Sequence, residues 1–336
     1  MNIKEIASLC GVSVATVSRC INQPDKVAAP TREKIMRIIE KKDYVPNPSA
    51  RSLSTGTTRT IGCVVPNLGN IYFTELVHGC QEILNKLGYH LLIYKTEGET
   101  DFWGKFNQRA VDGLIFSGID IKEDIKSLTS TLTIPYVVID HADALKKHPK
   151  ISTVYIDDEA GVGMALEYLY LEGNRRFGIL LGNDTDDTPL AARRFKVVEN
   201  FFKAHPDASY ISEHGNYVDL QVSKEACDKL MAHPERPTAI FAFSDMIAAG
   251  ALRSLYENRI KVPEEVEIIG FDDIPMCAFF TPALTTISAP NYDLGATAAQ
   301  ILIDKINGTE EVKHVLYPVE IMIRETTMNK VKPANE

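Results

Sequence analysis

The 336-residue sequence lacks the segments that export or membrane insertion would require. No apolar run reaches the length of about 18 residues that a membrane-spanning helix needs. The first residues, MNIKEIASLCG, carry Lys4 and Glu5 in place of a charged start followed by an apolar stretch and a cleavage site. We therefore expect a cytoplasmic protein that has no membrane partner.

The sequence is also poor in the motifs of enzymes and metal sites. Its six cysteines are scattered without a C-x-x-C pair, and its eight histidines are dispersed. It contains no G-x-S-x-G, no Walker-type phosphate loop and no H-E-x-x-H. We therefore expect no catalytic residue, no metal site and no cofactor, and we predict that the cysteines are reduced and mostly buried.

Charge is distributed unevenly along the chain. Residues 1–60 hold ten Lys and Arg against five Asp and Glu, a net charge of +5, which leaves −14 for the rest of a chain of formal net charge −9. A basic N-terminal part on an acidic body is typical of a nucleic-acid-binding module joined to a domain that does not touch nucleic acid. With 45% hydrophobic residues, the chain is long enough for two or three packing units.

The stretch GVSVATVSRCIN, residues 11–22, is rich in small, β-branched and hydroxylated residues, which are mediocre helix formers. An apolar helix face over residues 3–10, a turn at Gly11, a cap at Ser13, and Val17 and Ile21 four residues apart predict a helix-turn-helix. Small outward side chains would let the second helix lie deep in the major groove of double-stranded DNA. The residues predicted to contact DNA are Ser13, Val14, Ala15, Thr16, Ser18, Arg19 and Asn22.

These side chains differ in what they can contact. Val14 and Ala15 suit thymine methyl groups, and the Arg19 guanidinium matches the O6 and N7 acceptors of guanine. The serine and threonine hydroxyls suit phosphates. A third helix, with Pro30 in its first turn, would close a three-helix core. The segment DYVPNPSARSLS that follows could form only a helical turn or two, which is too short to be stable alone, so we expect it to fold against a partner.

From Thr60 onward, short apolar runs alternate with helical stretches, a pattern typical of parallel sheets with helices on both faces. Gly88 and Gly173 are predicted to end helices. Two such α/β halves, with the chain crossing between them near Ile156 and Ala289, would leave a cleft. The predicted strands are TIGCVVP, YHLLIY, GLIFSG, PYVVID, FGILLG, AIFAFS and EIIGFD, and the predicted helices cover 73–87, 193–202 and 246–256.

Ligand groups in open parallel sheets come from loops at the carboxyl ends of strands. Such loops here carry carboxylates, a guanidinium and aromatic rings, a combination that suits a polyol. Each residue also has a structural alternative: Asp272 could cap a turn, Arg193 could pair with a neighbouring acid, and Tyr217 could belong to the core. The candidate effector-binding residues are Tyr72, Phe73, Ser117, Asp140, Asp187, Arg193, Tyr217, Asp245 and Asp272.

A specific family resemblance is carried by two runs, IKEIASLCGVSVATVSRCINQPDKVAAPTREKI and DYVPNPSARSLSTGTTRTIGCVVPNLGNIYF. They resemble the head, hinge and first strand of the lactose/galactose repressor (LacI/GalR) family of bacterial transcriptional regulators, and the similarity covers essentially the whole chain. The resemblance implies a helix-turn-helix head over 1–45, a hinge helix over 46–58, and an effector-binding and dimerisation core over 59–336.

The implied core is an α/β structure of two Rossmann-like subdomains, like that of periplasmic sugar-binding proteins. The N-subdomain would hold about 59–157 and 289–318, and the C-subdomain about 158–288 and 319–336. Arg193 and Asp272 match the family's polar clamp, Phe73 and Tyr217 its aromatic contacts, and Asp140 a further carboxylate.

The resemblance also assigns roles in the DNA-binding part. Val14 and Ala15 match a galactose-repressor-like recognition helix, and Arg19 matches the family's guanine reader. Ala28 stands where relatives often have a capping serine, so the third helix is expected to begin less firmly. Family hinge helices pair across a dimer and drive a leucine into the minor groove, which kinks the DNA. The matching hinge residues are Asn47, Ala50, Arg51 and Leu53.

The predicted function is therefore repression of a carbohydrate-utilisation operon by a homodimer on a pseudo-palindromic operator, with a small sugar as effector. The tail RETTMNKVKPANE has no apolar heptads, which favours a dimer over a tetramer. Asp184, Asp186 and Asp187 argue against a purine or phosphorylated ligand. Whether the ligand induces or co-represses stays open.

Two alternatives remain beside this reading. One is a catabolite-control-type regulator that uses a phosphocarrier protein or another corepressor, although His78 stands near the place of a family arginine in that partner helix. The other, a periplasmic-type sugar-binding protein, is disfavoured by the basic N-terminal part.

Overall fold

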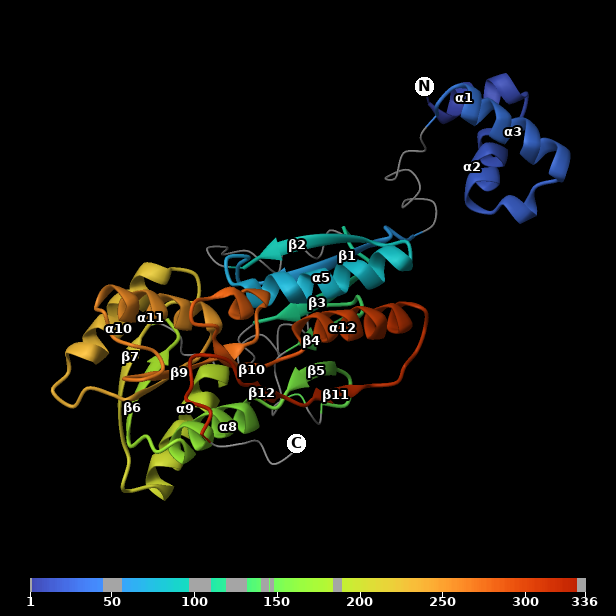
Figure 1. Cartoon of the computed structure of the whole chain (residues 1–336). Helices are drawn as coiled ribbons and strands as arrows, with labels where there is room; N and C mark the ends of the chain where they lie inside the picture. The colour runs from blue at the N-terminus through green and yellow to red at the C-terminus, as the bar shows by residue number, and fades with distance from the viewer. Residues whose placement is uncertain are drawn as a thin grey trace. The chain divides into compact units, whose positions relative to one another are not determined.

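The computed structural model describes residues 2–44, 56–96, 110–118, 132–139, 145, 148–183 and 189–330 (Figure 1). The chain forms two compact units: one comprises Met1–Arg59 and Arg109–Asp112, the other Thr60–Gln108 and Gly113–Glu336. Six of the predicted site residues lie outside the described parts of the chain: Asn47, Ala50, Arg51, Leu53, Asp140 and Asp187. Their roles stay predictions.

The first unit contains the three N-terminal helices that the sequence predicts. Gly11, at a φ of 63°, ends the first of them in the left-handed conformation, and the Ser13 hydroxyl caps the second. The elements are α1 (Ile3–Cys10), α2 (Val14–Asn22), the 3-10 turn η1 (Pro24–Lys26) and α3 (Ala29–Lys41). Their buried core consists of Ile6, Ala7, Cys10, Val17, Cys20 and Ile35. The helix-turn-helix prediction is confirmed.

The Asp112 carboxylate joins the two chain segments of this unit, Met1–Arg59 and Arg109–Asp112. Asp112 accepts hydrogen bonds from the main-chain N–H groups of Thr58 and Arg59, at 2.6 and 2.8 Å, and from the Thr58 hydroxyl at 2.8 Å. Three donors on one carboxylate fix the course of the chain just before Thr60, where the second unit begins.

The second unit is built on two six-stranded sheets. The first sheet has the order β11-β5-β4-β3-β1-β2, with all neighbours parallel. The second has the order β12-β10-β9-β8-β6-β7, in which β12 runs antiparallel to β10. The first sheet comprises β1 (Thr60–Val65), β2 (His90–Lys95), β3 (Gly113–Ser117), β4 (Tyr136–Ile139), β5 (Ser152–Ile156) and β11 (His314–Tyr317). The second comprises β6 (Arg176–Leu181), β7 (Ser209–His214), β8 (Ala239–Ala242), β9 (Glu267–Asp272), β10 (Thr285–Ser288) and β12 (Glu320–Met322).

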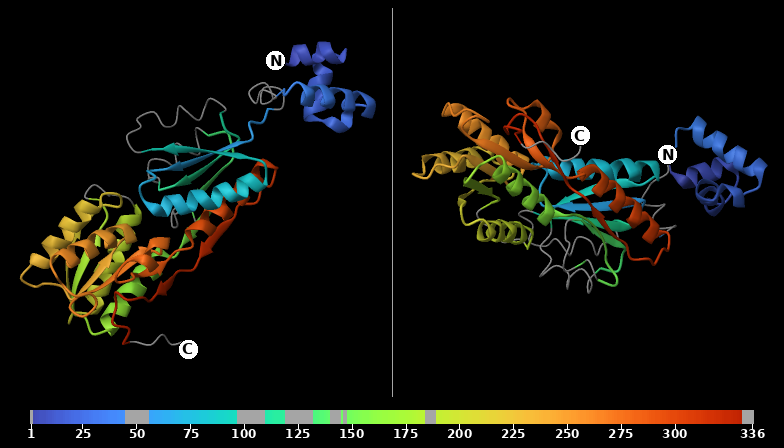
Figure 2. Two further views of the ribbon diagram at one scale, coloured as in Figure 1. Left: turned by 45° about the horizontal axis from the view of Figure 1, so that its top comes forward. Right: turned by 60° about the horizontal axis from the view of Figure 1, so that its bottom comes forward.

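Helices cover these sheets, and the inner strands are accordingly apolar and buried along their length. Two helices, α5 (Ile71–Lys86) and α12 (Asn291–Ile306), lie side by side against the first sheet (Figures 1 and 2). The second sheet carries α8 (Asp158–Leu171), α9 (Pro189–Ala204), α10 (Leu220–Ala232), α11 (Asp245–Glu257) and the 3-10 turn η2 (Pro275–Phe279). The predicted fold class, a helical head plus an α/β core of two sheets, is confirmed.

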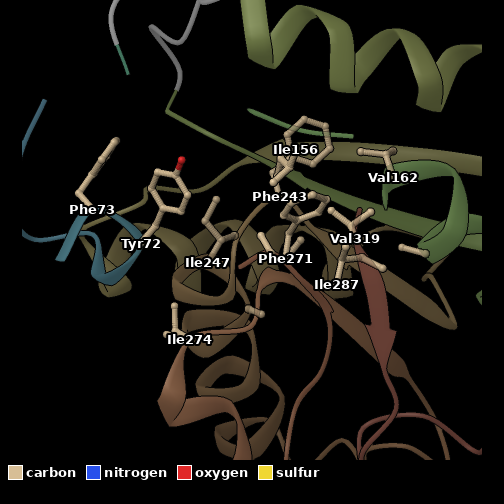
Figure 3. Close-up of a cluster of buried hydrophobic side chains, with 14 of the residues drawn as sticks. Tyr72, Phe73, Ile156, Val162, Phe243, Ile247, Phe271, Ile274, Ile287 and Val319 are labelled. Carbon is tan, nitrogen blue, oxygen red and sulfur yellow. The ribbon is translucent and has the colours of Figure 1, made fainter. Parts of the chain in front are cut away.

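The chain passes between the two sheets three times, from β5 into α8, from β10 into α12, and from β11 into β12. One hydrophobic cluster joins side chains of both halves, among them Tyr72 and Phe73 of α5 and Phe271 of β9 (Figure 3). Ligand groups at the carboxyl ends of both sheets can therefore meet around one site.

All six cysteines are free and buried, as predicted. None of the helices in the described ranges is long and apolar enough to cross a membrane.

Candidate functional site

The outward face of α2 carries the residues predicted to contact DNA. Ser13, Val14, Ala15 and Arg19 are exposed, and Thr16, Ser18 and Asn22 are half-buried. Val17 and Cys20 point into the head core and hold the helix against α1 and α3. The face therefore offers small side chains and one long cation, the arrangement that allows a helix to approach base edges closely.

The hydroxyls of Ser13, Thr16 and Ser18 on this face already have local partners. The Ser13 Oγ accepts the Thr16 N–H at 3.1 Å and lies 2.8 Å from the Thr16 hydroxyl. The Asn22 amide donates to the Ser18 Oγ at 3.4 Å. A hydroxyl can donate and accept at once, so these bonds fix the orientation of the groups and leave the predicted phosphate contacts chemically possible.

In the second unit, the predicted aromatic residues occupy the first turn of α5. Asn70 caps this helix by accepting the Tyr72 N–H at 3.1 Å. The rings of Tyr72 and Phe73 meet edge to face with centroids 4.9 Å apart. In the buried cluster, the Tyr72 ring lies between Phe73 and Ile247 of α11 (Figure 3). Tyr72 thus faces the second half of the unit, whereas the tip of the Phe73 ring lies close to Gly118 after β3.

Arg194, which is not among the residues predicted from the sequence, is the buried arginine of α9. Its Nε donates to Asp158 Oδ1 at 2.9 Å and its Nη1 to the Phe243 carbonyl oxygen at 2.9 Å. Its guanidinium carbon lies 4.0 Å from the centre of the Phe271 ring. Burial disfavours the charged guanidinium, but the neighbouring charges of Asp158 and Asp272 outweigh that effect and raise the pKa of Arg194.

The predicted Arg193 is half-buried on the same helix, and its effector role stays a prediction. Helical periodicity is the signal that distinguishes the two arginines. Arg194 precedes the buried Val198 and Phe201 by four and seven residues, which places it on the inner face of α9.

Asp272 ends β9 at the edge where the sequence predicts ligand groups. It is 5% exposed and adopts a φ of 112°, a conformation that non-glycine residues rarely take. Its main-chain oxygen accepts a hydrogen bond from Asn291 of α12 at 2.9 Å. Tyr217, half-buried after β7, also lies in the electrostatic surroundings of Arg194, as Asp272 does. Asp158 is thus the carboxylate in direct contact with Arg194, and Asp272 and Tyr217 act on the Arg194 guanidinium electrostatically.

Two predicted residues are fully buried. Ser117 is 0% exposed at the end of β3. Asp245 is also 0% exposed, and its two oxygens accept the Thr286 hydroxyl at 2.6 Å and the Ile274 N–H at 2.9 Å. Both oxygens of Asp245 therefore serve the fold, by linking α11 to β10 and to the segment after β9, and this geometry does not support the predicted effector contact.

Among the described residues, no group of three His, Cys, Asp or Glu side chains could hold a metal ion. The candidate site combines a buried guanidinium, carboxylates and aromatic rings, groups that are suited to hydrogen bonding and stacking.

Sequence comparisons decide the family. The model of the bacterial regulatory proteins of the lacI family matches residues 2–47, and that of the periplasmic binding protein-like domain matches residues 166–327. The HTH-type transcriptional repressor PurR of Aliivibrio fischeri (strain MJ11) is 32% identical over 344 residues, covering 98% of this chain and 99% of that protein. PurR of Vibrio parahaemolyticus serotype O3:K6 is 34% identical over 334 residues, covering 96% and 98%. The chain belongs to the LacI family of bacterial regulatory proteins.

Solved structures of transcriptional regulators agree with the fold. A transcriptional regulator CelR–cellobiose complex aligns with a TM-score of 0.71 at 25% identity, covering 97% of this chain and 99% of that one. A Lac repressor dimer bound to operator and the anti-inducer ONPF aligns with a TM-score of 0.86 at 23% identity over the same shares of the two chains, which supports the fold alone. An Enterococcus faecium LacI-family regulator with bound ribose aligns with a TM-score of 0.71 at 26% identity, covering 80% and 98%.

Membership of the LacI family confirms the predicted resemblance and the general function. The protein is a DNA-binding transcriptional repressor with an effector-binding core. Repressors of this family are non-enzymatic, in agreement with the prediction that the chain has no catalytic activity.

Proposed function

We propose that this repressor binds a pseudo-palindromic operator as a homodimer in the cytoplasm, and that a neutral sugar in its core changes its operator affinity. The observation that carries the choice of ligand is the buried Arg194–Asp158 pair beside Asp272 and Tyr217. Carboxylates accept hydroxyl hydrogens, a guanidinium donates to hydroxyl and ring oxygens, and an aromatic ring covers C–H faces. The cellobiose and ribose in the structures of similar regulators support a sugar.

The proposed operator contacts come from α2 and the hinge. Arg19 is exposed on α2 among small side chains, so its guanidinium can reach guanine in the major groove. Val14, 40% exposed in the first turn, is available to a thymine methyl group. Leu53, with its neighbours in the hinge, is proposed to enter the minor groove at the centre of the operator.

Exposed apolar residues in the second unit support the homodimer. Phe279 and Met276 of η2 are 85% and 49% exposed. Leu92 and Ile93 are 41% and 38% exposed on β2, which is the edge strand of the first sheet. Large apolar side chains on an edge strand and a surface turn are costly in water, and an identical second copy would cover both sets under two-fold symmetry.

The test is fluorescence anisotropy of the full chain on a labelled pseudo-palindromic duplex from upstream of its own gene, at fixed salt. Mono- and disaccharides, hypoxanthine and glucose 6-phosphate are added one at a time. Release of the duplex by a sugar supports an inducible repressor. Tight binding of hypoxanthine or the sugar phosphate in place of a neutral sugar would contradict the proposed ligand, and a response that needs an added phosphocarrier protein would favour the corepressor alternative.

The proposed dimer is tested by sedimentation of the same protein at micromolar concentration. A monomer would contradict the proposed homodimer, and a tetramer would contradict the limit to two subunits.

A further inference from the structure

Asn291, the first residue of α12, has a buried acceptor atom that the fold does not use. The residue is 5% exposed, and its side-chain amide nitrogen donates to the Asp272 main-chain oxygen at 2.9 Å. Its Oδ1 is buried and has no hydrogen-bond partner among the described residues. Because a carbonyl oxygen can only accept, the amide nitrogen must face Asp272, which fixes Oδ1 on the other side of the group.

An unpaired buried carbonyl is unfavourable, since its hydration is lost without replacement, and folded proteins rarely keep one. The position of Asn291 gives a reason for it. The residue opens the helix at the connection from β10 of the second sheet to the first sheet, and it contacts the end of β9. Asp272, which Asn291 contacts, belongs with Arg194 and Asp158 to the proposed effector site.

We propose that Asn291 Oδ1 accepts a hydrogen bond from a hydroxyl group of the effector. This inference rests on the proposed function and narrows it. The Asp272 carboxylate and the Asn291 carbonyl are both acceptors, so the ligand they select carries hydrogen-bond donors toward them. A neutral sugar with neighbouring hydroxyl groups meets that requirement, whereas a fully ionised phosphate carries no donor and is rejected by both.

The experiment is calorimetric titration of the full chain with D-ribose and cellobiose, followed by the monodeoxy derivatives of whichever sugar binds. Asn291→Leu keeps the approximate shape of the side chain and removes the acceptor, together with the amide donor to the Asp272 main-chain oxygen, so the comparison of deoxy sugars below isolates the acceptor. Tyr292→Phe is the matched control, because the Tyr292 hydroxyl donates to Glu82 on α5, and its loss leaves the Asn291 acceptor in place. Operator binding without sugar and the melting temperature show that each variant is folded.

We expect Asn291→Leu to bind the sugar roughly tenfold more weakly, and Tyr292→Phe to bind it as the unchanged protein does. We also expect one monodeoxy sugar to bind the unchanged protein roughly tenfold more weakly than its parent, and to bind Asn291→Leu no more weakly than the parent does. This second result pairs one hydroxyl with Asn291, and a general loss of stability would not produce it.

Two other outcomes are distinguishable. If a sugar binds but Asn291→Leu has an unchanged Kd, the Asn291 contact is wrong and the proposed function stands. If neither sugar binds the unchanged protein, the titration is extended to the other mono- and disaccharides of the anisotropy panel, and if none of them binds, the sugar proposal and this inference both fall.

Discussion

Gly79 of α5 and Gly295 of α12 each lie against the backbone of the opposite helix. A Cβ atom on Gly79 would stand 2.0 Å from the Tyr292 carbonyl oxygen, and one on Gly295 would stand 2.0 Å from the Leu76 carbonyl oxygen. The Cys80 thiol also contacts the Gly295 carbonyl oxygen at 3.2 Å. Only glycine permits this approach on both sides, so the crossing of α5 and α12 fixes the first turn of α5, which carries Tyr72 and Phe73.

Gly295→Ala is therefore expected to force the two helices apart and lower the free energy of unfolding by about 1 to 3 kcal/mol. The matched control is Gly163→Ala in α8, where a Cβ would meet nothing within 4 Å. In a helix interior, alanine is more stabilising than glycine by roughly 0.5 to 1 kcal/mol, so the control should be neutral or stabilising. Urea unfolding of both variants measures the difference, and equal effects would show that the close approach does not limit packing.

Arg194→Ala is expected to destabilise the second unit and to abolish the response to the effector. Removing one partner of a buried pair leaves Asp158 charged and unpaired, at a cost of about 3 to 5 kcal/mol. Arg193→Ala, which removes the same charge one residue earlier, should be much less destabilising because Arg193 is half-buried. Urea unfolding compares the stability of the two variants, and calorimetry with the effector sugar compares their sugar affinity. Loss of sugar binding only in Arg193→Ala would show that Arg193, not Arg194, is the arginine that binds the effector.

The sequence predicted the fold class because buried parallel strands have an unmistakable composition. Runs such as TIGCVV and EIIGFD are apolar without alternation, since helices cover both faces of the sheet. The predicted helix ends at Gly88 and Gly173 are confirmed by positive φ values of 73° and 104°. The strands β5, β7, β10, β11 and β12 were not predicted. They contain serine, threonine, histidine or charged residues, so the partner strands, not local composition, define them.

The sequence predicted the location of the candidate site better than the identity of the residues that form it. Loops at strand ends supplied Asp272 and Tyr217, as the topology of parallel sheets requires. The sequence could not show that both carboxylate oxygens of Asp245 accept hydrogen bonds from Thr286 and Ile274, because these donors are distant from Asp245 in the sequence. Asn291 carried no sequence signal, since its role follows from a contact with Asp272 that only the fold creates.

Arg19→Ala is expected to weaken operator binding by about 1 to 3 kcal/mol and to relax base preference at one position of each half-site. Arg37→Ala is the control, because Arg37 is exposed on α3 and the substitution removes the same charge from the same unit. Fluorescence anisotropy on operators with single base changes separates the loss of operator affinity from the loss of base preference. Equal discrimination between bases in the unchanged protein and Arg19→Ala would show that Arg19 reads no base.

Ala28→Ser is expected to stabilise the start of α3 by about 1 kcal/mol. Ala28 occupies the N-cap with a ψ of 137° and no side-chain hydrogen bond, whereas a serine there could accept an N–H of the first turn. Hydrogen exchange of the α3 amides in the full chain should slow. Ser13→Ala, which removes the existing cap of α2, should speed exchange in α2, and unchanged exchange in both variants would show that capping does not limit these helices.

The stability of the second unit should fall as pH rises through the acid range because of Asp245. Burial raises the pKa of this carboxyl to about 7, against 3.8 for an ordinary aspartate, so between these values the folded protein keeps a proton that the unfolded chain has released. Folding is therefore favoured by this group below about pH 4, and the advantage is lost progressively as pH approaches 7. Asp245→Asn removes the titration, so its free energy of unfolding should decline less than that of the unchanged protein between pH 5 and pH 8. Urea unfolding at both pH values measures the two slopes, and parallel slopes would mean that Asp245 is already ionised in the folded protein at pH 5.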